Sequence, residues 1–153
     1  MKRDILFRGK ATNRDPFYTY RTKYKNGDWV YGLLTDCENY TGFAEMTNTD
    51  GVSRIDVDKN TVGQYTGLTD KNGKKIFEGD IVHAIYKSGY TGISDKDFGI
   101  GVIKYSGTYY SGAAYQIDII GEPGCRVFSA SLQVEVIGNI HDNPELLKGG
   151  VQG

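Results

Sequence analysis

The chain has 153 residues, a length that corresponds to about one domain and can bury a core without disulfides or metal ions. Hydrophobic residues make up 39% and charged residues 24%, whereas 21 glycines, 12 tyrosines and only three prolines favour strands joined by tight turns. The sequence shows no secretory signal, no apolar run long enough for a membrane span, and two distant cysteines, Cys37 and Cys125. We therefore expect one compact cytoplasmic protein with reduced thiols and no membrane partner.

The net charge of −1 conceals an uneven distribution. Residues 1–25 contain eight basic and two acidic side chains, a net charge of +6, so residues 26–153 carry −7. Such asymmetry is typical of a nucleic-acid arm, of a complementary contact between subunits or within one chain, or of a solvated face. The candidate binding surface consists of basic and aromatic side chains of this N-terminal segment: Lys2, Arg3, Arg8, Lys10, Arg14, Arg21, Lys23, Tyr18 and Tyr20.

The first predicted element is a hairpin over residues 18–34. Tyrosines alternate with threonine and basic residues up to Lys25, which is a strand pattern, and Asn26-Gly27 then fits a type I′ turn with positive φ at both residues. In the second strand Trp29 and Tyr31 alternate with Val30 and Gly32. We expect Trp29 and Tyr31 to face the interior because large rings bury the most area.

Further strands are expected wherever apolar runs are separated by Gly, Asn and Asp. A second Asn-Gly turn is predicted at Asn72-Gly73, and a reversal at Gly79-Asp80. The segment over residues 61–105, with "EGDIV" followed by "GIGVIKY", is similar to SH3-like barrels, which bind proteins and nucleic acids alike. The predicted strands are 40–46, 52–57, 81–86, 101–105, 115–120, 126–129 and 134–138.

Only the C-terminal region shows helical signals. Asp142 or Asn143 can cap a helix there, and Pro144 suits its first position. The sequence thus predicts a mainly β fold, a small barrel-like or multi-hairpin domain with SH3-like elements and a short C-terminal helical turn. We expect a single domain over residues 1–148 and a flexible tail over residues 149–153.

Catalytic and metal-binding signatures of the common classes are absent from the sequence, including the phosphate-binding glycine loop, HExxH, CxxC and GxSxG. Zinc ligands usually come in close pairs, whereas Cys37, His83, Cys125 and His141 are scattered. A Cys-His dyad would need only proximity in space. We expect packed or loop thiols, no cofactor, and no enzyme activity.

Two further groups of polar residues have a structural and a functional interpretation. His83 shares a parity with Ile81 and Ile85, which favours a packed or edge-lying histidine. Five carboxylates could gather a divalent cation, but turn capping is the expected role because "DVDKN" lacks the features of an EF-hand loop. These carboxylates are Asp56, Asp58, Asp70, Glu78 and Asp80.

Several motifs together resemble a known family. "MKRDILFRGK", "NGDWVYGLL", "TVGQYTGLTDKNGKKIFEGDIV", "GVIKY" and "VIGNIHDNPELL" are similar, in order and over nearly the whole chain, to the YopX-like proteins of bacteriophages and prophages. The resemblance implies a mainly β protein encoded by phage or prophage DNA and present in the cytoplasm of the bacterial host. It implies no reaction and no catalytic residue, and it is weakest over residues 86–99 and 106–114.

Three functions of different classes are consistent with these observations. The first is a non-catalytic phage accessory protein that acts through contacts with phage or host proteins, or as a homo-oligomer. The second is weak nucleic-acid binding by the basic N-terminal segment, with phosphates neutralised by Lys and Arg and bases stacked on tyrosines. The third is an enzyme with an unrecognised site, which would place His83 or His141 beside a thiol or carboxylate in a cleft.

Overall fold

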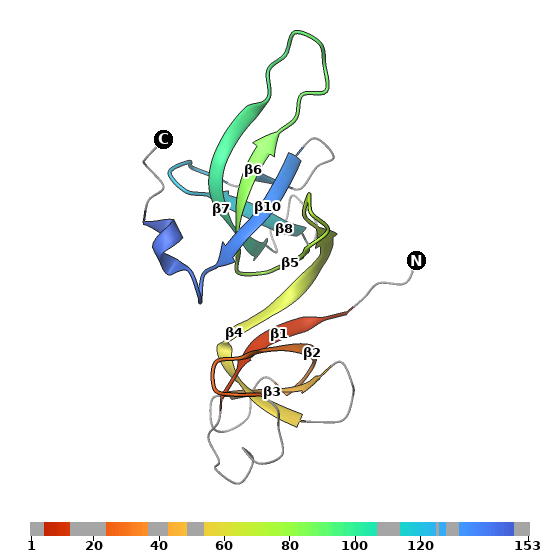
Figure 1. The fold of residues 1–153 in the computed structure, drawn as a ribbon, viewed down its shortest axis with the longest axis vertical. Helices are drawn as coiled ribbons and strands as arrows, with labels where there is room; N and C mark the ends of the chain where they lie inside the picture. Colours follow the sequence, from red (N-terminus) through yellow and green to blue (C-terminus); the bar gives the residue numbers. More distant parts are fainter. Residues whose placement is uncertain are drawn as a thin grey trace. The chain divides into compact units, whose positions relative to one another are not determined.

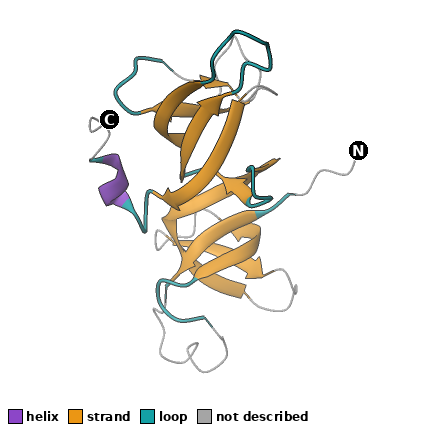
Figure 2. Cartoon of the chain, turned by 45° about the horizontal axis from the view of Figure 1, so that its top comes forward, coloured by secondary structure: helices purple, strands orange, loops and turns teal. Residues whose placement is uncertain are grey.

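Among the residues that the structure describes, strands make up nearly all of the regular structure, with one short helix near the C-terminus (Figure 2). The computed structural model describes residues 5–12, 24–36, 43–48, 54–106, 114–124, 126–127 and 132–148. Within them, the mainly β prediction and the C-terminal helical turn are confirmed.

The chain divides into two compact units, Met1–Tyr65 and Thr66–Gly153, where the sequence had predicted one. The division falls within a long strand, and each unit has its own apolar core. A single domain over residues 1–148 stays a prediction.

The first unit is built from four antiparallel strands (Figure 1). They are β1 (Phe7–Ala11), β2 (Trp29–Asp36), β3 (Phe43–Asn48) and β4 (Arg54–Thr69), whose last residues belong to the second unit. β1 pairs with β2 along one edge and with β4 along the other, so both of its edges are bonded. From its sequence, this segment is expected to be only part of the basic N-terminal segment, and β1 is not predicted.

The second unit consists of β5 (Lys75–Phe77), which pairs with the end of β4, and a sheet in the order β10-β6-β7-β8-β9. The members of this sheet are β6 (Asp80–Tyr86), β7 (Lys96–Ser106), β8 (Ala114–Ile119), β9 (Arg126–Val127) and β10 (Leu132–Asn139). The predicted strands 81–86, 101–105, 115–120 and 134–138 are confirmed within a few residues of their ends. The likeness to SH3 barrels stays a prediction.

The first core reverses the expected orientation of β2. Val30 is completely buried and Gly32 is buried, whereas Tyr31 is 40% exposed and Trp29 is half-buried. The interior side of this sheet is narrow: a methyl group on Gly9 would lie 3.0 Å from Val57. The prediction that the two rings face inward is therefore wrong, because small residues fit this side and the rings occupy the other. The buried members of this core are Ala11, Val30, Met46, Ile55 and Val57.

The second core is formed by apolar side chains of β5, β6, β7, β8 and β10. Its buried members are Ile76, Val82, Ala84, Ile103, Ile117, Ile119 and Val134. Close packing of β7 on β8 requires a glycine at position 101, where a Cβ atom would lie 2.5 Å from Ile117 Cγ2. β-branched side chains dominate this core, as expected for pleated surfaces that pack against each other.

The two Asn-Gly turns have positive φ only at the glycines. Gly27 has φ of +90° and Gly73 has φ of +80°, whereas every described non-glycine residue has negative φ. At the second turn the Gly73 N–H donates to Asp70 O and the Asp70 N–H donates to Lys74 O, the pattern of a type I turn followed by a left-handed glycine. Both turns are present, but the type I′ prediction for Asn26-Gly27 is wrong, because Asn26 has negative φ and Gly27 is the third residue of a turn in which the Asp28 N–H donates to Lys25 O. Residues 18–23, the predicted first strand of that hairpin, lie outside the described residues.

The C-terminal 3-10 helix η1 (Pro144–Leu147) starts at the expected proline. Asn143 is its N-cap residue but makes no side-chain capping bond; its Oδ1 accepts the Asn139 N–H instead. Residues 149–153, predicted as a flexible tail, lie outside the described residues.

Candidate functional site

Two residues of the predicted basic surface, Arg8 and Lys10, lie on β1 within the described residues. They share the side of β1 opposite to the core-facing Gly9 and Ala11. Arg8 is buried, with 6% of its surface exposed, and Lys10 is half-buried. The other predicted members lie outside the described residues: Lys2, Arg3, Arg14, Tyr18, Tyr20, Arg21 and Lys23.

Both cations lie over the indole ring of Trp29. The guanidinium carbon of Arg8 is 4.7 Å from the ring centroid, and the ammonium nitrogen of Lys10 is 5.4 Å from it. The strand register produces this contact, because Trp29 pairs directly with Lys10 and lies diagonally from Arg8. Cations over a ring gain electrostatic energy from its negative face. The role of Trp29 was missed because the β1–β2 pairing was not predicted.

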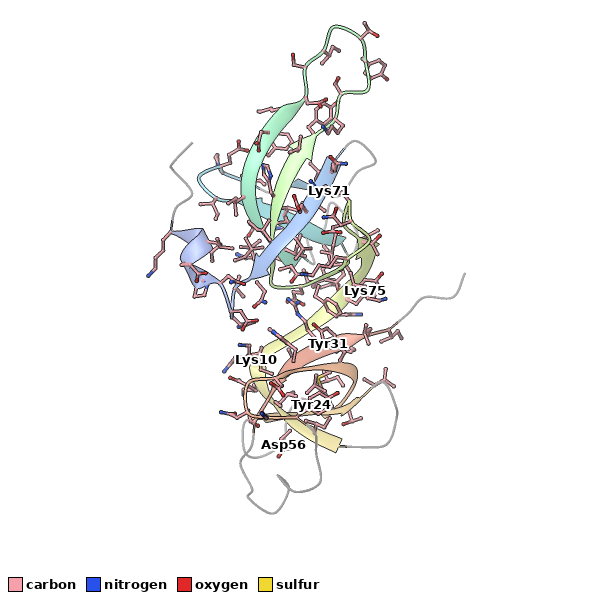
Figure 3. The ribbon with its side chains drawn as sticks, viewed as in Figure 1. Lys10, Tyr24, Tyr31, Asp56, Lys71 and Lys75 are labelled. Carbon is pink, nitrogen blue, oxygen red and sulfur yellow. The ribbon has the colours of Figure 1, made fainter. Side chains whose placement is uncertain are left out.

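Apolar surface continues along β2 beside this cation and ring cluster. Tyr31 is 40% exposed and Leu33 is 54% exposed, on the same side of the strand as Trp29. Figure 3 labels Tyr31 on β2 and Lys10 on β1. We call the set Arg8, Lys10, Trp29, Tyr31 and Leu33 the outer face.

The outer face has the chemistry of a protein-binding surface more than that of a phosphate clamp. Aromatic side chains and arginine are enriched in protein interfaces, where ring and aliphatic area is buried. A phosphate contact needs a cation that reaches solvent, and Arg8 is too deeply buried to supply one. What the outer face offers to a partner is apolar area with one positive charge, Lys10, at its border.

His83 lies beside a carboxylate, as an enzyme site would require. Its Nε2 is 2.8 Å from Oδ1 and 2.9 Å from Oδ2 of Asp97, which also accepts the Gly99 N–H at 2.7 Å. That N–H and the His83 ring hold the pKa of Asp97 below its usual value. The pair joins β6 to β7 at an irregularity of the ladder, and Asp97 is 61% exposed. The contact is a histidine–carboxylate hydrogen bond at the surface of the sheet.

His141 lies in the turn between β10 and η1. His141 is half-buried near Gly79, and its backbone N–H donates to Asn139 Oδ1. Cys37 and Cys125 lie outside the described residues.

The capping role predicted for the carboxylates is confirmed at three positions. Asp58 accepts the Asn60 N–H, and Asp80, which is 1% exposed, accepts the Phe77 N–H at 2.8 Å. Asp70 accepts backbone N–H groups from Asn72, Lys74 and Val136. Within the described ranges, no three His, Cys, Asp or Glu side chains are placed to hold a metal ion together.

A shallow hollow of about 350 Å³ lies over β8 and the turn after it. It is lined by Gln116, Asp118, Ile119, Glu122 and Gly124. Asp118 is bonded within its own sheet, because Lys104 Nζ lies 2.9 Å from Oδ2 and Gln116 donates to Oδ1. The hollow is polar and open, and the Asp118 carboxylate in its lining is already paired.

The fold and the outer face define a mainly β protein of linked hairpins with an aromatic, partly basic surface. A family model described as YopX protein matches residues 19–148. The chain belongs to the YopX family.

Two other comparisons complete this picture. The crystal structure of protein EF1440 from Enterococcus faecalis is similar to this chain with a TM-score of 0.44 and 23% sequence identity, over 95% of this chain and 99% of the other. The search of curated proteins finds no match. In the part of the chain that the structure describes, no helix has the length and apolar character needed to cross a membrane.

Proposed function

We propose that this YopX protein is a non-catalytic accessory protein of a phage or prophage, and that it acts through protein–protein contacts, self-assembly among them. The outer face is the observation that carries the proposal: Tyr31 and Leu33 are exposed beside an indole over which two cations are stacked. Rigid aromatic anchors of this kind supply most of the affinity in protein interfaces. The charge distribution adds complementarity, because residues 26–153 carry −7.

The test is the mass of the full chain in solution. We expect light scattering at micromolar concentration to give a mass above 17.0 kDa, and Tyr31→Ser with Leu33→Ser to lower it. Leu68→Ser is the matched control, because Leu68 is 43% exposed on a different strand segment. Deletion of residues 1–16 is unsuitable, since it would remove β1 and leave the partner edges of β2 and β4 open.

A monomer of 17.0 kDa at every concentration would contradict the self-assembly part of the proposal. An oligomer whose mass is unchanged by the double substitution would instead contradict the assignment to the outer face. Circular dichroism of each variant separates a lost contact from a lost fold.

Nucleic-acid binding is the second candidate, favoured by the +6 charge of residues 1–25. If six or more phosphates are contacted, affinity for DNA or RNA should fall by about three decades or more between 50 and 200 mM salt. The burial of Arg8 against Trp29 argues for fewer contacts. A complex that stays tight at physiological salt would rank this candidate first.

A further inference from the structure

The loop between β6 and β7 is held by its own polar groups. The Ser88 side chain is buried, with the residue 6% exposed; its Oγ donates to Ile93 O at 2.5 Å, and the Ser88 N–H donates to Asp95 Oδ1. Lys87 Nζ lies 2.9 Å from Asp95 Oδ2 and closes the base of the loop. The loop extends beyond the ends of the two strands at the top of Figure 1. A loop whose conformation is already fixed by internal hydrogen bonds loses less conformational entropy on binding than a flexible loop.

The apex of this loop presents two large apolar side chains. Tyr90 is 73% exposed and Ile93 is 59% exposed. They are the first and last residues of a tight turn in which the Ile93 N–H donates to Tyr90 O at 3.3 Å and Gly92 has φ of +86°. The ends of such a turn lie within about 7 Å of each other, so the two side chains are neighbours. Figure 3 shows side chains that project from the loop away from the strands.

The charge of the loop restricts the kind of partner. Residues 89–94, "GYTGIS", carry no charged side chain, and Lys87 is paired with Asp95 below them. An uncharged apex neutralises no phosphates and attracts no anionic lipid headgroups. It suits an uncharged apolar pocket, where the Tyr90 ring is buried with its hydroxyl at a polar edge.

The size of the apex also restricts the partner. Two copies that met apex to apex would bury only a few side chains, far below the roughly 800 Å² per partner of a standard interface. A pocket that surrounds the apex buries it from several sides. The hollow at Gln116, Asp118 and Glu122 is polar and does not match it.

We propose that the β6–β7 apex inserts Tyr90 and Ile93 into an apolar pocket of a different protein. The proposal rests on the proposed protein-contact function but uses another surface than the outer face. Its variants leave Tyr31 and Leu33 intact, so failure of one proposal is distinguishable from failure of the other.

The first experiment places the photoreactive residue p-benzoylphenylalanine at Thr91, between the two apex residues, in the full chain expressed in the strain from which the gene comes. Illumination should give one discrete adduct with a second protein, and peptide mapping should locate the cross-link beside an apolar pocket of that protein. The same residue at the exposed Lys148 should not give this adduct. Tyr90→Ser with Ile93→Ser should abolish it.

The second experiment uses the purified partner and calorimetric titration. The double substitution should weaken binding by about tenfold or more, the effect of losing two anchors. Ile137→Ser, which removes a side chain 38% exposed on β10, should leave the affinity unchanged within about twofold. The bracing groups Ser88 and Asp95 remain, so the thermal midpoint of the double variant should equal that of the wild type.

Four outcomes overturn the proposal. The first is that no adduct forms at Thr91, and the second is an adduct between two copies of this chain. The third is a cross-linked partner that binds the double variant as tightly as the wild type. The fourth is binding to phosphatidylcholine–phosphatidylglycerol vesicles that the double substitution abolishes. The second outcome would assign the apex to self-assembly and the fourth to a lipid surface.

Discussion

The backbone N–H of Lys10 donates to the side-chain hydroxyl of Thr61 at 2.8 Å, a bond across 51 positions of the sequence. At this point the β1–β4 ladder changes register, from Arg8 opposite Gly63 to Lys10 opposite Asp58. The Thr61 hydroxyl in turn donates to Asp58 O at 2.6 Å. A buried side chain therefore takes the place of a ladder carbonyl where the strand bulges.

Replacing Thr61 tests this substitute bond. Thr61→Val keeps the shape but leaves the Lys10 N–H and Asp58 O without the hydroxyl, which should lower the free energy of unfolding by about 1 to 3 kcal/mol. Thr61→Ser keeps the hydroxyl and should cost less. Urea unfolding of the three proteins measures the difference. Equal stability of the valine variant and the wild type would show that water satisfies both groups.

Asp70 should make stability depend on acid pH. Burial raises the pKa of this carboxyl, but backbone N–H groups of Val136, Lys74 and Asn72 outweigh it and hold the pKa below its ordinary value of 3.8. Because the folded pKa is depressed, the stabilisation is fully present above the unfolded value and is lost as pH falls through the folded value. Asp70→Asn should thus be less stable than the wild type at pH 7, and the difference should shrink below about pH 4. Thermal unfolding of both proteins from pH 7 to pH 2 measures this difference in stability. A difference that stays constant over this pH range would contradict the role of the Asp70 carboxylate.

Trp29 should contribute to stability through its cations more than through burial. Trp29→Ala removes the ring that Arg8 and Lys10 cover and should cost about 1 to 2 kcal/mol. That is less than the roughly 3 to 5 kcal/mol expected for a fully buried tryptophan. Trp29→Phe keeps an aromatic ring, so its free energy of unfolding, measured by chemical denaturation, should lie between those of the wild type and Trp29→Ala. If Trp29→Ala lowers the free energy of unfolding by more than about 2 kcal/mol, the indole acts as a core residue.

Asn72 and Gly73 have different roles in the turn at residues 70–73. Gly73→Val should destabilise by about 1 to 2 kcal/mol, because a β-branched residue resists positive φ. Asn72→Ala should change stability by less than about 0.5 kcal/mol, because Asn72 has negative φ and lies at the surface. A type I′ turn would instead make both substitutions costly. Thermal midpoints of the two variants decide between these turn types.

Strands whose alternation coincided with Gly, Asn and Asp punctuation could be predicted from sequence. β6 and β10 are examples: β6 is an apolar run between turn residues with Ile81, Val82 and Ala84 buried, and Val134 of β10 lies in the same core as Val82. β1 has a similar pattern, with Phe7, Gly9 and Ala11 on one side and Arg8 and Lys10 on the other. The basic side chains of this segment fit a solvated or nucleic-acid-binding arm as well, so the sequence alone does not identify the strand.

The outer face could be predicted only in part. Sequence analysis selected Arg8 and Lys10 from charge, but Trp29 joins them through a cross-strand register that no local pattern specifies. The orientation of β2 was equally ambiguous, since "WVYGLL" is apolar on both sides. The choice depends on how little space Gly9 and Val57 leave on the core side.

The double pairing of β1 has a consequence for the order of folding during synthesis. β1 is made before both strands that bond to its edges, and β4 supplies residues 57–64 only after some fifty further positions. At about 5 to 20 residues per second the ribosome needs roughly 3 to 10 s for that distance. During this interval Phe7 and Ala11 have no completed core to enter, because Ile55 and Val57 are not yet made. The first unit is thus a late-closing structure, because its N-terminal strand can pair along both edges only after β4 has left the ribosome.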